Sequence, residues 1–396
     1  MHVRHPIWLQ GLATPSARAF AVLFALESLT RAIVSTVIPL QVFRLLGDSQ
    51  QVSVVFFAVG ACGLCLNFTI PLLVRLISRR YTYSLGVLCL GFATILFPYE
   101  MTGLTAAAML LRVFGVACLA ICLNLYILDY IKGKDLNRLE PLRLFFAAGA
   151  WTLGPWLGVF LWTEVAAWLP FAISGGSAVA LLGYFWVLRA SDNRVIIRAL
   201  APPPNPLLNI GRFWAQPRLR LAWLIATTRS AWWAMFFIYG PIFAVKSGLG
   251  EQAGGLMVSA GNALLFAAPL LGRLSQAKGV RWTVVTAFLG GGALTLAAAG
   301  LAWMVPALGA LLLVAAAVCA VALDVTGNLP FLRMVKPSQR ASMTTVYVTY
   351  RDFSEVGPPG VFAILLKVFP LPAVFVASAL SMFAMSWFAR YLPRRM

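Results

Sequence analysis

The sequence predicts an all-α integral membrane protein with twelve transmembrane helices, and three observations lead to this fold class. Of the 396 residues, 61% are hydrophobic and 11% are charged, whereas soluble domains are about 45–50% apolar and about 25% charged. Twelve apolar stretches follow one another, each close to the roughly 20 residues that cross a bilayer. The polar loops between them alternate in charge. Most of this chain is therefore expected to be surrounded by lipid.

The apolar stretches form two sets of six, separated by one long polar segment. The first set is predicted at 17–43, 51–77, 82–99, 103–130, 142–163 and 167–188. The second set is predicted at 219–244, 252–274, 282–304, 306–332, 341–366 and 370–392. The segment between them is rich in proline, which favours an extended chain over a helix. We therefore predict an N-terminal six-helix bundle over 1–188, a cytoplasmic linker over 189–218 and a C-terminal six-helix bundle over 219–396.

Basic residues give the predicted orientation. The net charge is +19, and the loop arginines and lysines are concentrated on the side of the two termini. Only Arg44, Lys246 and Lys367 are assigned to loops of the opposite side. Because positive residues are retained in the cytoplasm, both termini are predicted to be cytoplasmic, in a plasma membrane such as the bacterial inner membrane. This distribution explains the basic excess without a nucleic-acid partner.

The two predicted bundles contain similar short segments at a nearly constant spacing. Pro71–Leu76 recurs as Pro269–Leu274, 198 residues later, and Arg31 recurs as Arg229 within matching tripeptides. The other matches are Gly154–Phe160 with Gly357–Phe362, which includes Pro155 and Pro358, and Asn124–Leu125 with Asn328–Leu329. Because these matches keep their order along the chain, we interpret the bundles as an internal repeat with pseudo-symmetry.

Three motifs support a resemblance to a known family. The loop after the second span reads Pro71-x3-Arg75-x2-Ser78-Arg79-Arg80. It keeps the Arg-Arg end of the family signature Gly-x3-Asp-x2-Gly-Arg-Arg, while both glycines and the aspartate are replaced. The fourth span carries Arg112-Val113-Phe114-Gly115, and the fifth carries Gly154-Pro155-x2-Gly158, as in proton antiporters.

With six plus six spans, the chain resembles the major facilitator superfamily over nearly its whole length. The resemblance implies that these loop and glycine motifs act in gating. Arg75 stands where the family has the aspartate of its usual gating salt bridge.

Eight charged residues lie in the interior of the predicted spans, away from their ends, where each costs about 2.5–3.5 kcal/mol on insertion scales. They are Glu27, Arg31, Arg112, Arg229, Asp324, Arg351, Asp352 and Glu355. Two pairs, Glu27 with Arg31 and Arg351 with Glu355, have the spacing of neighbours on one helix face. Such pairs either lock helices together or line a central cavity, where binding sites of transporters lie.

Substrate contacts are predicted from the arginines. Arg31 and Arg229 occupy related positions of the two halves and are expected to face each other across the cavity, with Arg112 nearby. Guanidinium groups bind carboxylates or phosphates through paired hydrogen bonds. Trp232 and Trp233 follow Arg229 closely and are predicted either to form an aromatic wall of the site or to pack against helices or lipid.

Proton coupling would depend on carboxylates, because both histidines lie in the N-terminal tail. The candidates are Glu27, Asp324, Asp352 and Glu355. Asp324 has no basic residue within one turn of its own helix, which favours it as the titrating acid; a structural hydrogen-bond acceptor is the alternative. No nucleotide-binding loop, metal motif or catalytic signature is found, so neither an enzyme nor a cofactor is expected.

The predicted function is secondary transport of a small organic solute, anionic or zwitterionic, by alternating access. The antiporter-like motif slightly favours proton-coupled export, with proton-coupled uptake as a close alternative. A lipid flippase is a further possibility, and a non-transporting sensor, assembly factor or scaffold is the alternative from another class. The expected partners are the substrate, protons and the bilayer, and the chain is expected to be monomeric.

Overall fold

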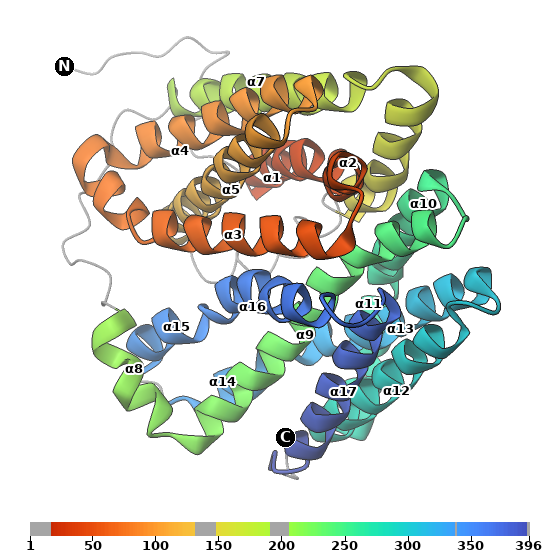
Figure 1. Ribbon diagram of the computed structural model, residues 1–396. Helices are drawn as coiled ribbons and strands as arrows, with labels where there is room; N and C mark the ends of the chain where they lie inside the picture. The colour runs from red at the N-terminus through yellow and green to blue at the C-terminus, as the bar shows by residue number, and fades with distance from the viewer. Residues whose placement is uncertain (1–16, 131–147, 191–205, 337–338, 394–396) are drawn as a thin grey trace. The chain divides into compact units, whose positions relative to one another are not determined.

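The computed structural model describes residues 17–130, 148–190, 206–336 and 339–393, and within these ranges the chain is helical with short turns (Figure 1). Residues 191–205 of the predicted linker and the start of the predicted fifth span, up to 147, lie outside the described residues. The described helices before the linker are α1 (Ala17–Ala32), α2 (Val37–Leu46), α3 (Ser49–Asn67), α4 (Ile70–Leu96), α5 (Thr102–Tyr130) and α7 (Leu169–Ala190). A helix over 148–160 continues into the π-helical turn η3 (Leu161–Val165).

The helices after the linker begin with the short α8 (Pro206–Trp214) and the long α9 (Pro217–Lys246). They continue with α10 (Glu251–Ala263), α11 (Ala268–Lys278), α12 (Val280–Leu301), α13 (Pro306–Thr326), α14 (Leu329–Met334), α15 (Arg340–Tyr347), α16 (Tyr350–Leu365) and α17 (Pro372–Ala389). Short 3-10 turns, η2 (Phe97–Tyr99) and η4 (Leu264–Ala267), follow α4 and α10.

Ten helical segments within the described ranges are long and apolar enough to cross a membrane. The predicted fifth and eleventh spans are not among them. The predicted fifth span begins outside the described residues. The predicted eleventh span is divided between α15 and the 16-residue α16, which carries Arg351, Asp352 and Glu355. The presence of twelve transmembrane helices therefore remains a prediction.

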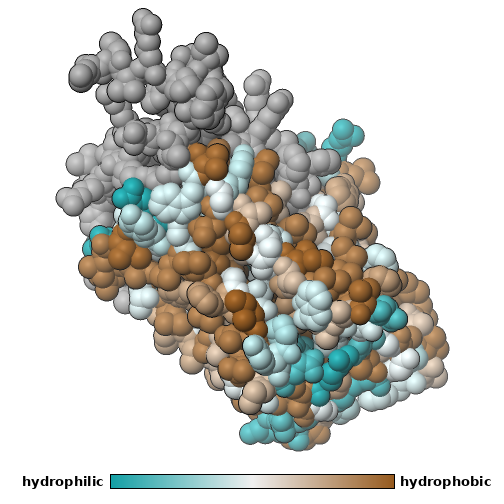
Figure 2. Space-filling model, turned by 90° about the horizontal axis from the view of Figure 1, so that it is seen from above, coloured by the Kyte–Doolittle hydropathy of each residue, from teal (hydrophilic) through white to brown (hydrophobic). Residues whose placement is uncertain are grey.

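The surface is apolar, as expected of a chain in lipid. Leu76, Val179, Leu311 and Ile364 are each more than half exposed. Figure 2 shows apolar residues over much of the visible face, with hydrophilic residues in smaller patches. Exposure of such a large apolar surface to water is unfavourable, whereas contact with lipid acyl chains is not.

The chain divides into two compact units, one formed by 1–37 with 61–201 and the other by 38–60 with 202–396. In the first unit α4 packs against α5 and α7, and α1 packs against α7. Its core contains Tyr83 stacked on Phe185, with ring centroids 4.3 Å apart. In the second unit α12 lies beside α13 and α17 (Figure 1), and α9 packs against α10 and α16.

The stretch 38–60 packs within the second unit, although the sequence assigns it to the N-terminal bundle. Arg44 Nη2 lies 2.9 and 3.1 Å from the two carboxylate oxygens of Glu251. The hydroxyl groups of Ser53 and Tyr239 are 2.6 Å apart. The sequence predicted neither contact, because repeat offsets identify related positions and not neighbours.

Candidate substrate site

The first predicted span is broken close to Arg31. α1 ends at Ala32, residues 33–36 form a turn, and α2 resumes at Val37. The turn is rich in β-branched residues, which are poor helix formers, but it contains neither glycine nor proline. The sequence predicted a membrane span over 17–43, and Val22–Leu46 is one of the ten candidate spans, with the turn inside it.

A break leaves backbone carbonyl groups without their usual helical donors. Here three side chains replace those donors. The bonds are Ser174 Oγ to Thr30 O (2.6 Å), Arg112 Nη2 to Arg31 O (3.1 Å) and Ser35 Oγ to Ala32 O (2.7 Å). Arg112, which comes from α5, is therefore held at the break by a charge-assisted bond. Broken helices of this kind are typical of transporter binding sites.

The glycines of the antiporter-like motif allow the helix over 148–160 to approach this break. A Cβ atom on Gly158 would overlap the carbonyl oxygen of Ile33, and one on Gly154 would lie 2.9 Å from the Cβ of Ala32. Pro155 is buried between them. The repeat does not reproduce this packing at Gly357, where a Cβ would meet no atom within 4 Å. Pro358 follows inside α16.

Glu27 and Arg31 form the ion pair that their spacing predicted. Arg31 Nη1 lies 3.2 Å from Glu27 Oε1, and Glu27 is buried while the Arg31 side chain is 30% exposed. The Arg31 guanidinium also lies 5.8 Å from the ring centroid of Trp151. The first unit therefore contains a partly open cation next to a broken helix.

In the second unit the corresponding arginine is buried and is bound by other helices. Arg229 Nε, on α9, lies 3.1 Å from Oδ1 of Asp324 on α13. The other carboxylate oxygen of Asp324 accepts a hydrogen bond from Trp233 Nε1 (2.9 Å). Asp324 thus has a basic partner after all, supplied by a different helix, which spacing along α13 did not reveal.

Tyr350 connects Arg229 to a second guanidinium. Its hydroxyl oxygen accepts from Arg229 Nη2 (3.2 Å) and from Arg351 Nε (3.3 Å). Arg351 also interacts electrostatically with Glu355, four residues later on the same helix, and with Asp352. Asp352 is partly buried and Glu355 is exposed on the same helix. Sequence reasoning did not assign Tyr350 to the site, and its only signal was its place beside Arg351.

The two predicted aromatic residues have different roles. Trp233 contacts the charged cluster through Asp324, as described above. Trp232 is buried, donates its indole N–H to Thr295 Oγ1 (3.0 Å) and stacks on Phe236 at 5.2 Å. Trp232 is therefore a core residue, which agrees with the packing alternative.

The predicted gating loop contains a strained residue. Ser78 interrupts α4 with φ +71°, in the left-handed region that glycine adopts readily. The matching turn between α11 and α12 has Gly279, with φ +88°. Ser78 stands where the family signature has its second glycine. Arg75, Arg79 and Arg80 flank the strained residue; Arg75 is exposed, and Arg79 and Arg80 are partly buried.

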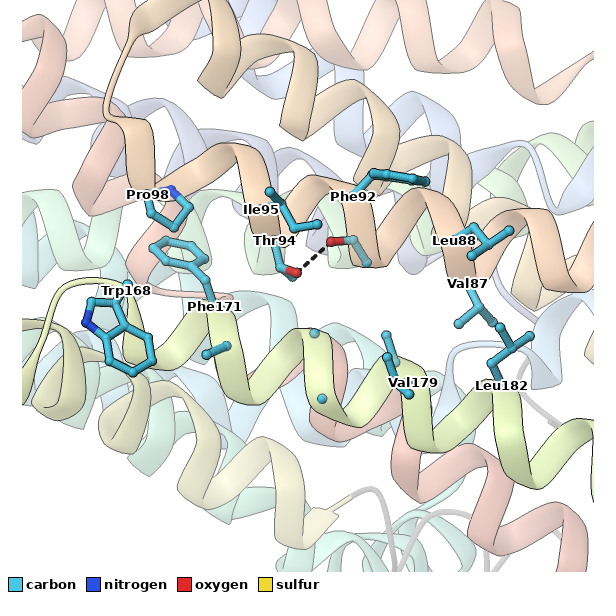
Figure 3. Close-up of a pocket in the computed structure, with 15 residues that line it drawn as sticks. Val87, Leu88, Phe92, Thr94, Ile95, Pro98, Trp168, Phe171, Val179 and Leu182 are labelled. Atoms are coloured by element: carbon cyan, nitrogen blue, oxygen red, sulfur yellow. Dashed lines mark hydrogen bonds between the residues drawn. The ribbon is translucent and has the colours of Figure 1, made fainter.

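A separate groove of about 480 Å³ lies between α4 and α7 (Figure 3). Its lining is apolar and includes Val87, Phe92, Ile95, Val179 and Leu182, and Figure 3 shows their side chains around the opening. The hydroxyl group of Thr94 is already bonded to the carbonyl of Gly91 (2.7 Å). Phe92, Ile95 and Val179 are more than half exposed. The groove contains no charged residue, so it is not the site that the sequence predicted.

The family assignment follows from comparison with known proteins. The family model described as Major Facilitator Superfamily matches residues 20–358. The chain belongs to the major facilitator superfamily. Its fold is therefore that of a multi-pass membrane protein. A comparison with curated protein sequences gave no match.

Solved structures of this superfamily are similar to the chain in fold. The nucleoside transporter NupG is 12% identical with a TM-score of 0.73, covering 95% of this chain and 98% of that one. A POT family transporter in complex with 5-aminolevulinic acid is 12% identical with a TM-score of 0.75, covering 93% and 95%. A bacterial homologue of the iron transporter ferroportin, in an inward-facing state, is 14% identical with a TM-score of 0.68, covering 95% and 98%. Family and neighbours indicate a transporter rather than an enzyme.

Proposed function

We propose that this chain is a secondary active transporter of small organic anions that couples their uptake to protons. The observation that carries the proposal is the convergence of Arg229 and Arg351 on the hydroxyl oxygen of Tyr350. Asp324 is the partner of Arg229, while Asp352 and Glu355 act electrostatically on Arg351. A carboxylate or phosphate group of a substrate that displaced one of these carboxylates would bind both guanidinium groups through charge-assisted hydrogen bonds.

Tyr350 is suited to the same ligand. Because its oxygen accepts from both guanidinium groups, its own hydroxyl hydrogen remains for an additional acceptor. Arg351 is exposed, whereas Arg229 is buried. An entering anion would therefore meet Arg351 first and reach Arg229 afterwards.

Asp324 supplies the coupling in this proposal. Its carboxylate neutralises Arg229 and accepts from Trp233, so it occupies the position that a substrate carboxylate would need. An anion that binds Arg229 displaces Asp324, and a carboxylate that loses its cation takes up a proton more readily. Anion and proton then bind together, which favours symport over the antiport that the Gly154-Pro155 motif suggested.

The first unit would contribute its own substrate contacts. Arg31 is partly open beside Trp151, and Arg112 is fixed at the broken helix. We propose both as further contacts of the anion. We also propose that the protein acts as a monomer without a cofactor, in the plasma membrane with both termini cytoplasmic, as its loop charges predict.

The proposal is tested by ligand-dependent stabilisation of the purified full-length protein. The panel contains citrate, benzoate, 5-aminolevulinic acid, uridine and a cationic amine. We expect organic anions to raise the melting temperature and the cation and the nucleoside to leave it unchanged. Arg351→Gln should abolish the shift, whereas the matched control Arg333→Gln, at an exposed arginine of α14, should retain it. Stabilisation by uridine alone would contradict the anion class, and no stabilisation by any solute would favour a scaffold or sensor.

A further inference from the structure

The turn between α13 and α14 contains the space that the Arg229 guanidinium fills. A Cβ atom on Gly327 would overlap Nη1 of Arg229 and lie 2.8 Å from its Cζ. The turn itself is fixed, because Tyr347 Oη donates to the carbonyl of Gly327 (3.2 Å) and lies 3.1 Å from Oδ1 of Asn328. The guanidinium is buried. If Gly327 carried a methyl group, the Arg229 guanidinium would have to leave its position.

The backbone conformation does not require a glycine at this position. Gly327 has φ −59° and ψ −35°, a helical conformation that alanine adopts more readily than glycine does. The Leu323 carbonyl oxygen also lies 2.8 Å from the added Cβ, which is farther than the overlapping Nη1 of Arg229 but closer than a Cβ atom normally comes. The missing side chain therefore provides space chiefly for Arg229 and, to a smaller extent, for this carbonyl group.

Gly327 also lies where it aligns Arg229 with its partners. Asp324 precedes it by three residues at the end of α13, so both are on one face of the helix. A guanidinium that rests on Gly327 has its Nε beside Asp324 and its Nη2 beside Tyr350. A displaced guanidinium would lose both contacts.

We propose that Gly327 is the positioning residue of the anion site, which holds the Arg229 guanidinium between Asp324 and Tyr350. The link to anion recognition rests on the proposed function, but the positioning itself does not.

The test compares melting temperatures of full-length variants without ligand. Gly327→Ala should lower the melting temperature by several degrees, and more than half of this loss should disappear in the Arg229→Ala background. Gly292→Ala is the matched control, because its Cβ would lie 2.9 Å from the Phe383 ring, away from any arginine. Its loss should be the same in both backgrounds. If Gly327→Ala fails to fold, the double variant with Arg229→Lys, which keeps a cation beside Asp324, should still be recovered.

A second readout separates positioning from mere packing. With citrate or benzoate as the probe, Gly327→Ala should lose the stabilising shift. Arg229→Lys together with Gly327→Ala should restore part of it, because the lysine keeps the charge and lacks the Nη atoms. Equal losses from Gly327→Ala in both Arg229 backgrounds would overturn the proposal. If those losses differ as expected and no anion stabilises the wild type, the positioning stands and the proposed function fails.

Discussion

Each of the two units holds an arginine against an interruption of a helix, and the two arrangements are not copies of each other. In the first unit Arg112 bonds the carbonyl that the break after α1 exposes, while Arg31 pairs with Glu27 on its own helix. In the second unit Arg229 rests on the turn after α13 and pairs with Asp324 on a different helix. Related positions in a repeat have thus acquired different partners.

This difference matters for function because the two ion pairs differ in how easily their partners can separate. Glu27 is nearly fully buried and is tied to a neighbour one turn away, so their separation changes little when helices move. Arg229 and Asp324 belong to separate helices, and the Asp324 side chain is 32% exposed. An incoming anion or a helix movement can separate that pair. The comparison therefore assigns proton coupling to the second unit.

The largest expected effect comes from Arg229→Ala. Arg229→Ala removes a buried guanidinium together with its contacts to Asp324 and Tyr350, which should cost about 3 kcal/mol of unfolding free energy. Arg31→Ala removes a guanidinium that is 30% exposed but leaves the buried Glu27 without this partner, and it should cost about 1–2 kcal/mol. Melting curves of the two purified variants check this ranking. Equal losses would show that the two arginines are equivalent.

A smaller effect is expected at the break in the first unit. Arg112→Met keeps most of the side-chain volume but removes the donor to the carbonyl of Arg31, which should cost about 1.5–3 kcal/mol. Ser174→Ala removes the neutral donor to Thr30 and should cost about 1 kcal/mol. Thermal unfolding measures both. A loss for Ser174→Ala as large as that for Arg112→Met would exclude a special role of the charged bond.

The smallest expected effect concerns the two matching turns, Ser78 and Gly279. Ser78→Gly relieves a left-handed conformation and should stabilise the protein by about 1 kcal/mol. Gly279→Ala introduces the same strain into the second unit and should destabilise it by a similar amount. The melting temperatures of the two variants should move in opposite directions. Movement in the same direction would contradict the equivalence of the turns.

Much of this architecture follows from composition, because lipid demands long apolar helices and segregated charges. Arg229 and Asp324 were also recognisable, since a charge inside a span requires a reason. The ion pair between Arg229 and Asp324 could not be recognised from the sequence, because it joins α9 to α13 across 95 positions. The turn after Ala32 contains no glycine or proline, and its signal in the sequence was Pro39, which cannot donate to the carbonyl of Ser35. Trp232 and Trp233 are adjacent in sequence, and only packing decides which of them is core.

The central claim is that an organic anion displaces Asp324 from Arg229 and so brings a proton with it. Proton uptake by the purified protein in weakly buffered detergent, on addition of an anion that stabilises it, tests this most directly. The wild type should take up roughly one proton per bound anion, as one displaced carboxylate requires, and Asp324→Asn should bind the anion without taking up a proton. Proton release, or equal uptake by both proteins, would contradict the claim.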